Sequence, residues 1–368
     1  MARVVLVEPY YGGSHRAWVD AWVRHTRHEI TLVTHPDAFW RWRMRGGAVT
    51  LAAAFDDVVA AHGRPDAVVV SGLVDVAAFA GHARRSLGNR PLATYVHESQ
   101  MLYPLAPNQR ADTSLALVNW QSLVASDQVW FNSTFHRDAM REAMPRLLKS
   151  QPTPSHIHLV DPVFERSTVL WPGVETVALI AGERSEREMP RVLWNQRWDH
   201  DKNPHAVFSA LADLADEGVS FTVALAGQNQ RPDNPEFAWV RERLGERIVH
   251  YGFVPDDEYQ DFLLSGDVVV SAAGHEFFGI AIVEAIAAGA VPILPNRLSF
   301  PELIEPSWHQ TTLYPDGELR NRLRSVLTDV GAAKAAVDGL RKSMVCFDAA
   351  TSATAHDDAI DQLMLRQR

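Results

Sequence analysis

Cysteine is nearly absent from this chain of 368 residues, which contains only Cys346. A single cysteine excludes an intramolecular disulfide and any multi-cysteine zinc site, and it is typical of proteins from a reducing compartment. The chain also lacks any run of about 20 apolar residues, the length that a membrane span requires. Its start, Met1 to Val7, reaches Glu8 before a signal peptide could form. We therefore expect a cytoplasmic protein with no membrane contact.

Positive charge is in deficit, because 35 Lys and Arg residues face 45 Asp and Glu residues, for a formal net charge of −10. This balance argues against a protein that coats nucleic acid over its whole surface, since such binders neutralise many phosphates. Any RNA contact must therefore be local. Low-complexity tracts are missing as well, and hydrophobic residues make up 46% of the chain, a value typical of globular proteins. The length suits two domains.

Short β-branched runs alternate with helical patterns in both halves of the chain. They predict strands over residues 3–8, 29–34, 66–71, 91–97 and 128–133 in the first half, and over 191–196, 220–227, 247–252, 267–272 and 290–295 in the second. Runs this apolar suit parallel sheets that are covered on both faces. We predict an α/β fold of two doubly wound, Rossmann-like domains that face a central cleft.

The boundary between the two predicted domains lies near residue 180. The stretch Gly182–Pro190 is rich in charge and bounded by Gly and Pro, which marks a linker. The first domain then covers residues 1–180 and the second residues 181–346, and a polar helix over 347–368 could pack back on the first. Open parallel sheets bind ligands beyond the carboxyl ends of their strands, so we look for chemistry on the loops that follow strands.

The most informative such loop opens the stretch HEFFGIAIVEAIAAG, residues 275–289. A helix that starts near Phe278 or Gly279 would offer the backbone N–H groups of Phe278, Gly279 and Ile280 to pyrophosphate oxygens. Glu276 precedes this helix and Glu284 lies in its second turn. Because a carboxylate accepts hydrogen bonds from vicinal hydroxyls, Glu284 would hold a ribose and Glu276 a transferred sugar. An arbitrary pair of glutamates is more often solvated, but the glycine-started apolar helix favours the site.

Two cations follow the first strand of the second half. Arg197 and Lys202 are candidates for binding a diphosphate and for stabilising the charge that develops as it leaves. The alternative is that both merely pair with Asp199 and Asp201. After the strand over 247–252, Val254 belongs to a loop that could read a nucleobase edge or could be an ordinary turn.

The first half offers weaker candidates for the acceptor side. Gly12 and Gly13 follow the first strand in a tight turn, which is not a dinucleotide fingerprint because the third glycine is missing. One stretch interleaves indoles with guanidiniums, a combination that suits unstacked RNA bases and phosphates. Its residues are Trp40, Arg41, Trp42, Arg43 and Arg45. In an extended segment the arginines would share one face, whereas in a helix the tryptophans would pack inward. His136 and Arg137 are weaker candidates for the same contact.

These residues resemble the retaining glycosyltransferases of family four, which have the GT-B fold. The resemblance covers most of the chain and lies in the spacing of Glu276 and Glu284, in Arg197 and Lys202, and in the Pro-Gly-Val at 172–174. Within the first half, residues 6–15, 40–48 and 95–104 resemble the tRNA-queuosine mannosyltransferases. That resemblance implies transfer of mannose from GDP-mannose to the cyclopentenediol of queuosine in a tRNA anticodon of the tRNA-Asp type, with retention of configuration.

The resemblance also implies roles for individual residues. His97 would meet the transferred sugar, Gly12 and Gly13 would lie near the diphosphate, and a set of further residues would face the acceptor: Ser14, His15, Glu98 and Gln100. No acid is clearly placed for a double displacement, so we favour same-face substitution, with Glu98 as the best candidate for a base if one is needed. We expect no metal and no cofactor beyond the nucleotide-sugar substrate.

Other functions fit the same features. A glycosyltransferase that uses another nucleotide-sugar, such as a UDP-sugar, on a small acceptor would share the donor motif, and a nucleotide-sugar epimerase shares the architecture. A tRNA-binding module without turnover is a candidate of another class. Nothing in the sequence indicates an obligate protein partner, and the expected partners are a nucleotide-sugar and tRNA.

Overall fold

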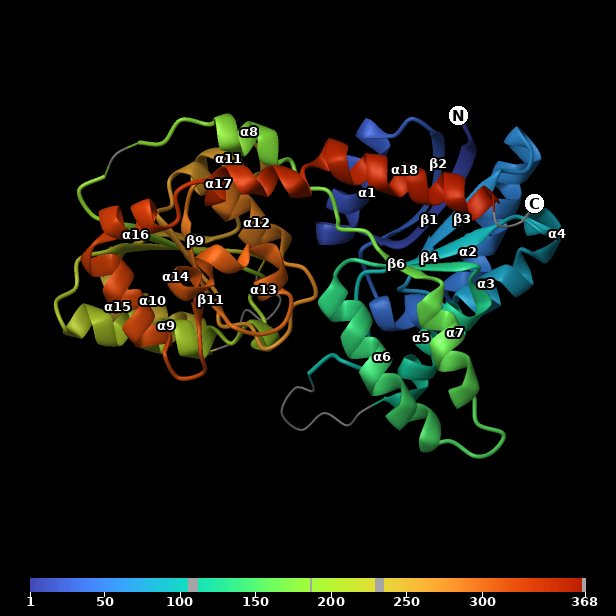
Figure 1. Cartoon of the computed structure of the whole chain (residues 1–368), viewed down its shortest axis with the longest axis horizontal. Coiled ribbons are helices and arrows are strands. Elements are labelled where there is room, and N and C mark those ends of the chain that lie inside the picture. Colours follow the sequence, from blue (N-terminus) through green and yellow to red (C-terminus); the bar gives the residue numbers. More distant parts are fainter. Residues whose placement is uncertain (105–111, 186, 229–234, 366–368) are drawn as a thin grey trace. The chain divides into compact units, whose positions relative to one another are not determined.

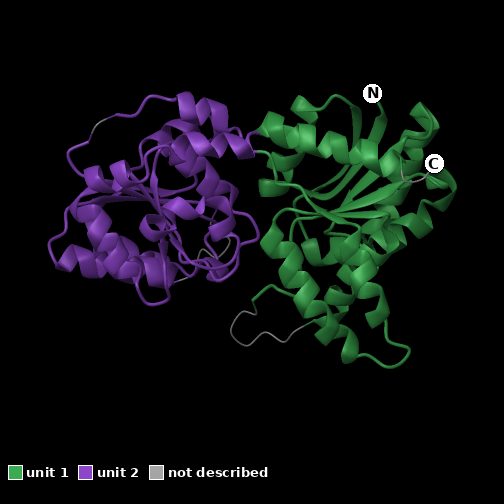
Figure 2. Ribbon diagram, in the orientation of Figure 1, with its two compact units in different colours: residues 1–173, 349–368 green, residues 174–348 purple. Residues whose placement is uncertain are grey.

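The computed structural model describes residues 1–104, 112–185, 187–228 and 235–365. The chain forms two compact units, one of residues 1–173 together with the chain from Ala349 onward, the other of residues 174–348 (Figure 2). Each unit is built on its own six-stranded parallel sheet with helices on both faces (Figure 1). No helix among the described residues is both long and apolar enough to cross a membrane.

The sheet of unit 1 has the strand order β2-β1-β3-β4-β5-β6. Its strands are β1 (Arg3–Tyr11), β2 (Glu29–Pro36), β3 (Ala67–Ser71), β4 (Leu92–Val96), β5 (Gln128–Phe131) and β6 (Ser167–Val169). Every residue of β3 and β4 is buried, as expected for central parallel strands with helices on both faces. The strand order reverses between β1 and β3, and such switch points are where open α/β sheets bind ligands.

Helices cover both faces of the unit 1 sheet. Alternate residues of β1 enter different cores: Leu6 packs with α1 and α18, whereas Val7 packs with α2 and α3. The helices are α1 (Gly13–His25), α2 (Trp40–His62), α3 (Val76–His82), α4 (Arg84–Leu87), α5 (Thr113–Ala125), α6 (Thr134–Lys149), α7 (Val160–Glu165) and α18 (Ala349–Leu365), with the 3-10 helix η1 (Ile157–Leu159).

The last helix, α18, belongs to unit 1, where it lies beside α1 (Figure 1). Its buried Asp357 accepts hydrogen bonds from Nε1 of Trp22 at 2.9 Å and from the backbone N–H of Arg27 at 2.7 Å. Ile360 is fully buried in the same core. The chain divides after Gly173, a few residues before the boundary that the sequence indicated near residue 180.

The sheet of unit 2 has the order β12-β11-β10-β7-β8-β9, so its switch point lies between β10 and β7. Its strands are β7 (Arg191–Asn195), β8 (Thr222–Ala226), β9 (Ile248–Gly252), β10 (Val268–Val270), β11 (Val291–Pro295) and β12 (Leu313–Tyr314). Its helices are α8 (Thr176–Ala181), α9 (Pro204–Asp216), α10 (Pro235–Leu244), α11 (Asp256–Leu264), α12 (Ile280–Ala287), α13 (Phe300–Leu303), α14 (His309–Thr312), α15 (Leu319–Thr328), α16 (Val330–Ala336) and α17 (Leu340–Ser343). The 3-10 helices are η2 (His200–Lys202), η3 (Gly245–Arg247), η4 (Pro306–Trp308) and η5 (Met344–Phe347).

Aromatic side chains fill the core of unit 2. Trp194, Trp198, Phe208 and Phe237 are all buried there, and the rings of Trp198 and Phe237 stack with centroids 4.2 Å apart. Both tryptophans come from β7 and the loop after it, so this packing fixes the loop that carries Arg197. The predicted fold class, two Rossmann-like α/β units, is confirmed, and each expected strand forms with shifted ends.

Candidate active site

Arg197 and Lys202 follow β7, at the switch point of the unit 2 sheet. Lys202 is buried, and its Nζ donates hydrogen bonds to Oε2 of Glu276 at 3.0 Å and to the carbonyl of His275 at 2.9 Å. Since β7 and β10 are neighbours in the sheet, the loops that follow them meet. Two residues that the sequence predicted on different loops thus lie together.

Asp201 is a fully buried carboxylate beside both cations. Its Oδ2 lies 3.3 Å from Nη2 of Arg197 and 3.4 Å from Nζ of Lys202. Burial lowers the pKa of Lys202, but the carboxylates of Glu276 and Asp201 outweigh burial and raise this pKa above its usual value. The ammonium group therefore keeps its charge at neutral pH. The sequence also allowed both cations to pair with neighbouring acids, and Asp201 does pair with both of them.

The helix α12 begins at Ile280, slightly later than the sequence indicated, with Gly279 as its N-cap. Gly279 has φ +104, a left-handed conformation that glycine adopts without steric cost. Phe278 is buried ahead of the helix, and the start expected near Phe278 or Gly279 agrees with a helix whose N-cap is Gly279. The helical N–H groups without an acceptor in the preceding turn begin with Ile280 and Ala281.

Glu284 lies in the second turn of α12 and is half-buried. Its Oε2 accepts a hydrogen bond from the hydroxyl of Tyr259, on α11, at 2.9 Å. Burial raises the pKa of Glu284 to about 7, although the hydrogen bond from Tyr259 lowers it. This carboxyl therefore changes charge near neutral pH. Sequence reasoning missed Tyr259, because a tyrosine in an amphipathic helix carries no signal of such a contact.

A pocket of about 550 Å³ lies beyond the ends of β8 and β9 in unit 2. It is lined by Trp198, Gly227, Gln228, Tyr251, Gly252 and Phe253. Ligand pockets of roughly 300–1,000 Å³ are usual for small molecules, and the aromatic lining offers a surface on which a base can stack. Val254, the residue singled out from the sequence, is itself buried, and its neighbour Phe253 is 66% exposed.

In unit 1, Gly12 and Gly13 connect β1 to α1, which begins at Gly13. A Cβ atom at Gly12 would lie 2.2 Å from Oδ2 of Asp37, so only glycine fits beside this side chain. Gly13 has φ +50 and open space around it. The expected tight turn is therefore a strand-to-helix junction at the switch point of the sheet, with Ser14 exposed.

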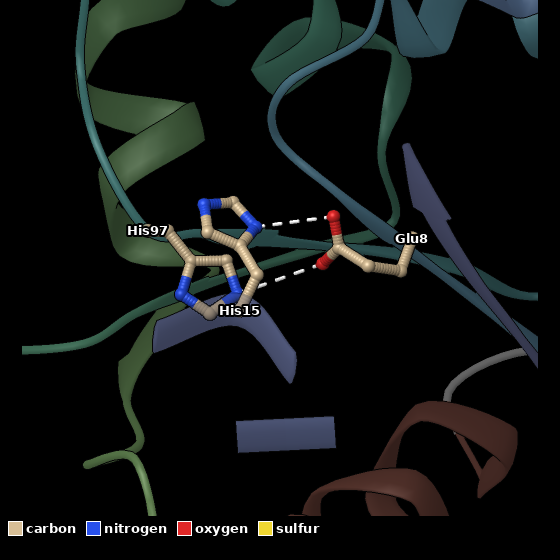
Figure 3. A group of neighbouring side chains, drawn as sticks. All are labelled: Glu8, His15 and His97. Carbon is tan, nitrogen blue, oxygen red and sulfur yellow. Dashed lines mark hydrogen bonds and ion pairs between the residues drawn. The ribbon is translucent and has the colours of Figure 1, made fainter. Parts of the chain in front are cut away.

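His15 and His97 lie together beside a residue that the sequence did not single out, Glu8 (Figure 3). Glu8 is fully buried within β1, and its Oε1 lies 3.1 Å from Nδ1 of His15. Its Oε2 lies 3.9 Å from Nε2 of His97. The signal that could have found Glu8 is a carboxylate within an otherwise apolar strand.

Glu98 and Gln100, both half-buried, follow β4. Nε2 of Gln100 donates to Oε1 of Glu98 at 2.9 Å, and the backbone N–H of Gln100 donates to Oδ1 of Asn119 at 3.0 Å. These bonds hold the loop after β4 in one conformation. The Glu98 carboxylate is thus already engaged, and its predicted role as a base stays a prediction.

The stretch from Trp40 to Arg45 is helical, because it forms the first turns of α2, so the extended interpretation is wrong. Trp42 is 64% exposed, and its indole covers Gly46 one turn later. Arg41 and Arg45 are exposed while Arg43 and Trp40 are half-buried. In a helix the tryptophans were expected to pack inward, but Trp42 projects outward.

The amino end of α2 presents further groups beside Trp42. Phe39, its N-cap residue, is 80% exposed and has φ +56. The guanidinium of Arg41 lies 5.2 Å from the centre of the Trp40 ring, and Arg45 pairs with Asp112. The sequence did not single out Phe39, because its exposure depends on this left-handed backbone.

Of the two weaker candidates for RNA contact, His136 faces the protein core, while the contact predicted for Arg137 stays a prediction. His136 is fully buried, and its Nδ1 lies 2.8 Å from Oδ1 of Asn132, because it sits in the first turn of α6 and faces the core. Arg137 pairs with the neighbouring Asp138. The prediction that His136 contacts RNA is therefore wrong, because its buried side chain cannot reach a phosphate from this position.

Among the residues that the structure describes, two groups of side chains have the spacing that a divalent ion requires. One is Asp199, His200 and Asp201, and the other is Glu8, His15 and His97. Asp199 already contacts Nδ1 of His200 at 2.8 Å. In the second group, Glu8 is hydrogen-bonded to His15, so we assign hydrogen bonding rather than metal binding to it. The expectation of a metal-free site stays a prediction.

Comparisons with known proteins address both units. A family model described as the N-terminal part of tRNA-queuosine alpha-mannosyltransferase matches residues 3–174, and one described as glycosyl transferases group 1 matches residues 180–342. The tRNA-queuosine alpha-mannosyltransferase of Drosophila melanogaster is 30% identical over 311 residues, which cover 82% of this chain and 81% of the relative. The chain belongs to the tRNA-queuosine alpha-mannosyltransferase family. It is a glycosyltransferase, as the sequence predicted.

Shorter and more distant matches agree with this assignment. A GDP-mannose-dependent alpha-(1-6)-phosphatidylinositol dimannoside mannosyltransferase of Mycobacterium tuberculosis is 30% identical over 28% of this chain and 26% of its own length. Among solved structures, the sucrose-phosphate synthase of Thermosynechococcus elongatus has a TM-score of 0.75 at 16% identity over the whole of both chains. HepE of Anabaena with UDP and glucose has a TM-score of 0.68 at 16% identity over 98% and 100%. The GT-B fold is thereby confirmed for this family member.

Proposed function

We propose that this protein transfers mannose from GDP-mannose to the cyclopentenediol of queuosine in the anticodon of a tRNA of the tRNA-Asp type, with retention of configuration. The family assignment supports the reaction class, and the relative from Mycobacterium tuberculosis supports GDP-mannose as donor over a shorter stretch. The observation that carries the proposal is the contact of Lys202 with Glu276 next to the amino end of α12. It joins a cation for phosphate to a carboxylate for sugar hydroxyls.

In this proposal the donor binds along the switch point of unit 2. The nucleobase occupies the pocket lined by Trp198 and Phe253. The ribose hydroxyls donate to Glu284, and the diphosphate accepts from the N–H groups at Ile280 and from Lys202. Arg197, whose side chain is 37% exposed, supplies the second cation.

The chemistry we propose is same-face substitution. An oxygen of the diol forms a bond to C1 of mannose while the bond from C1 to the phosphate oxygen breaks, and the hydroxyl proton passes to the departing phosphate. Arg197 and Lys202 stabilise the charge that grows on the leaving GDP. Glu276 accepts hydrogen bonds from mannose hydroxyls and keeps the sugar aligned for attack. No step in this scheme uses a metal or a cofactor.

The acceptor side of the proposal rests on the amino end of α2. Phe39 and Trp42 expose aromatic rings on which unpaired bases can stack, and Arg41 lies beside them. This local combination resolves the conflict between RNA binding and a net charge of −10. Because the acceptor is a tRNA, we place the reaction in the cytoplasm.

The test is mass spectrometry of nucleosides from queuosine-containing tRNA after incubation with the protein and GDP-mannose. We expect queuosine to gain one hexose, and tRNA with guanosine in place of queuosine to gain none. Transfer only from UDP-sugars, or only to a small acceptor, would favour the alternative glycosyltransferase. Binding of tRNA without transfer from any donor would mean a module without turnover, and either result contradicts the proposal.

A further inference from the structure

Glu8, the acid found beside His15 and His97, has no role in the proposed chemistry. Its side chain is 0% exposed, and those of His15 and His97 are 7% and 8% exposed. A carboxylate at this depth is retained only where partners compensate for its lost hydration.

The two carboxylate oxygens of Glu8 each lie nearest to a different histidine. Oε1 accepts the backbone N–H of Tyr10 at 2.7 Å and lies 3.1 Å from Nδ1 of His15. Oε2 lies 3.9 Å from Nε2 of His97. Oε2 and this Nε2 are both buried, and neither finds a hydrogen-bond partner within the described part of the chain. A small rotation of either side chain would join them.

The imidazole rings of His15 and His97 lie face to face, with centroids 4.0 Å apart and planes 34° apart. Two imidazolium ions at this distance would repel each other strongly, so at most one ring is charged. The side chains that also face this pair are Tyr10, Trp18, Tyr95, Glu98, His136 and His356.

These surroundings decide which ring carries the charge. Burial, and then the neighbouring histidines, lower the pKa of His97 well below its usual value. Burial also lowers the pKa of His15, but Glu8 outweighs it, with a smaller contribution from Glu98, and the net pKa is raised. Burial keeps the pKa of Tyr95 well above its usual value, so Tyr95 stays neutral. The raised pKa of His15 favours its imidazolium form, and the lowered pKa of His97 favours its neutral form.

Each ring turns one nitrogen toward Glu8 and directs the other away from it (Figure 3). The second nitrogen of His15 is Nε2, which carries a proton in the imidazolium and is therefore a donor. The second nitrogen of His97 is Nδ1, which is an acceptor when the proton on Nε2 faces the carboxylate. A donor and an acceptor side by side suit ligands that carry hydroxyl groups.

We propose that Glu8 is a positioning residue for glycosyl transfer, which holds His15 as a hydrogen-bond donor to the acceptor diol and His97 as a hydrogen-bond acceptor for a substrate hydroxyl. This inference rests on the proposed function. In it, His15 binds the diol oxygen that does not attack, and the proton of the attacking hydroxyl still passes to the leaving phosphate. Glu8 acts through the two rings, as the buried acid of a catalytic triad acts through its histidine.

The first experiment compares Glu8→Gln with the wild type in the transfer assay across pH. Without the Glu8 carboxylate, burial is opposed only by the smaller contribution of Glu98, so His15 loses its proton at lower pH. We expect kcat/KM for tRNA to fall about 10- to 100-fold at neutral pH, the range for partners that orient a functional histidine. The loss should shrink as pH falls, while affinity for GDP stays unchanged.

A matched control is Asp357→Asn, which alters another buried carboxylate of unit 1 that contacts neither His15 nor His97. We expect this variant to be less stable but to keep the pH profile of the wild type. A Glu8→Gln profile that is lowered equally at every pH would show a merely structural role and would overturn the proposal. If Glu8→Gln fails to fold, Glu8→Asp keeps the charge at a shorter reach and should retain the pH profile with a reduced rate.

The second experiment titrates the histidines by NMR in the unliganded wild type and in Glu8→Gln, with His15→Asn to assign the signal. It needs no substrate, so it separates this inference from a failure of the proposed function, which would appear as absent transfer by the wild type. We expect the pKa of His15 to drop in Glu8→Gln. An unchanged His15 titration, or rings that bind Zn²⁺ and do not titrate, would contradict the proposal.

Discussion

Three residues of unit 2 fix the position of a cation before a sugar diphosphate binds. They are Lys202, Glu276 and Asp201. The ammonium group of Lys202 lies between two carboxylates, one buried and one partly accessible, so its position is fixed before any ligand arrives. A cation held in this way stabilises developing phosphate charge without a further cost of reorganisation. Glu276 gains a fixed orientation from the same contact.

Glu276→Gln should lower kcat/KM for sugar transfer by about 100- to 1,000-fold, the range for loss of one preorganised polar group. The amide keeps the shape but loses the charge that aligns Lys202 and that accepts from hydroxyls. Steady-state kinetics with a matched exposed change, Glu242→Gln, checks this. Equal activity of the two variants would remove Glu276 from the site.

Affinity for GDP should rise with pH, because the pKa of Glu284 is raised to about 7 by burial. Below this pH the carboxyl is protonated and accepts fewer hydrogen bonds from ribose, so affinity should drop about tenfold between roughly pH 8 and pH 6. Calorimetry of GDP binding measures this effect, and Glu284→Gln should flatten the curve.

Tyr259→Phe provides the complementary test of the same group. Its hydroxyl donates to Glu284 and lowers the pKa of that carboxyl, so its loss should move the rise in GDP affinity to higher pH. A curve that moves to lower pH, or a wild-type affinity that does not vary with pH, would show that Glu284 does not contact the nucleotide.

Residue by residue, the sequence predicted the groups on loops far better than those inside elements. Arg197, Lys202 and Glu276 follow strands, where parallel sheets place ligands, and the structure brings them together. Glu8 lies inside β1, where only tertiary packing shows that its carboxylate meets two histidines. A rule that searches loops cannot find it.

At the scale of elements, the amino end of α2 carries the RNA-binding part of the proposal. Trp42→Ala should weaken tRNA binding by about 5- to 100-fold, because stacking of one base contributes about 1–3 kcal/mol. Arg41→Ala should weaken it and also reduce its dependence on salt. Filter binding at several salt concentrations measures both, with Arg84→Ala on α4 as control. Unchanged binding in both variants would exclude this surface.

The packing of α18 on α1 gives a second prediction for an element. Ile360 is fully buried in the unit 1 core, so Ile360→Ala should lower the free energy of unfolding by about 2–5 kcal/mol. Thr354→Ala, an exposed change on the same helix, should alter it by less than about 0.5 kcal/mol. Urea denaturation compares them. A small effect of Ile360→Ala would mean that α18 is not part of this core.

The strands that the sequence missed are β6 and β12. β6 has three residues and β12 two, and such lengths show no periodicity, since they are strands only through pairing with β5 and β11. The start of α12, by contrast, follows directly after Gly279, because a glycine there marked the helix start in the sequence.

At the scale of the whole molecule, each unit has one switch point, and the candidate residues gather at both. Strand order follows from pairing that no local pattern specifies, yet alternation of strands and helices was enough to predict two parallel sheets. Which strands become neighbours, and therefore that the loops after β7 and β10 meet, required the structure.

The proposed chemistry uses Arg197 and Lys202 in place of a metal, which is a property of the complete enzyme. Transfer activity should therefore be unchanged after treatment with a chelator and should not increase when Mg²⁺, Mn²⁺ or Zn²⁺ is added back. Rates with metal-free buffers measure this. Loss of activity on chelation, restored by one ion, would contradict the metal-independent scheme.

The most direct test of the account is a crystal structure of the protein with GDP-mannose. We predict that the diphosphate lies at the amino end of α12 within hydrogen-bond distance of Lys202, with the ribose at Glu284 and the mannose at Glu276. A diphosphate bound elsewhere, or a ribose out of reach of Glu284, would contradict the account.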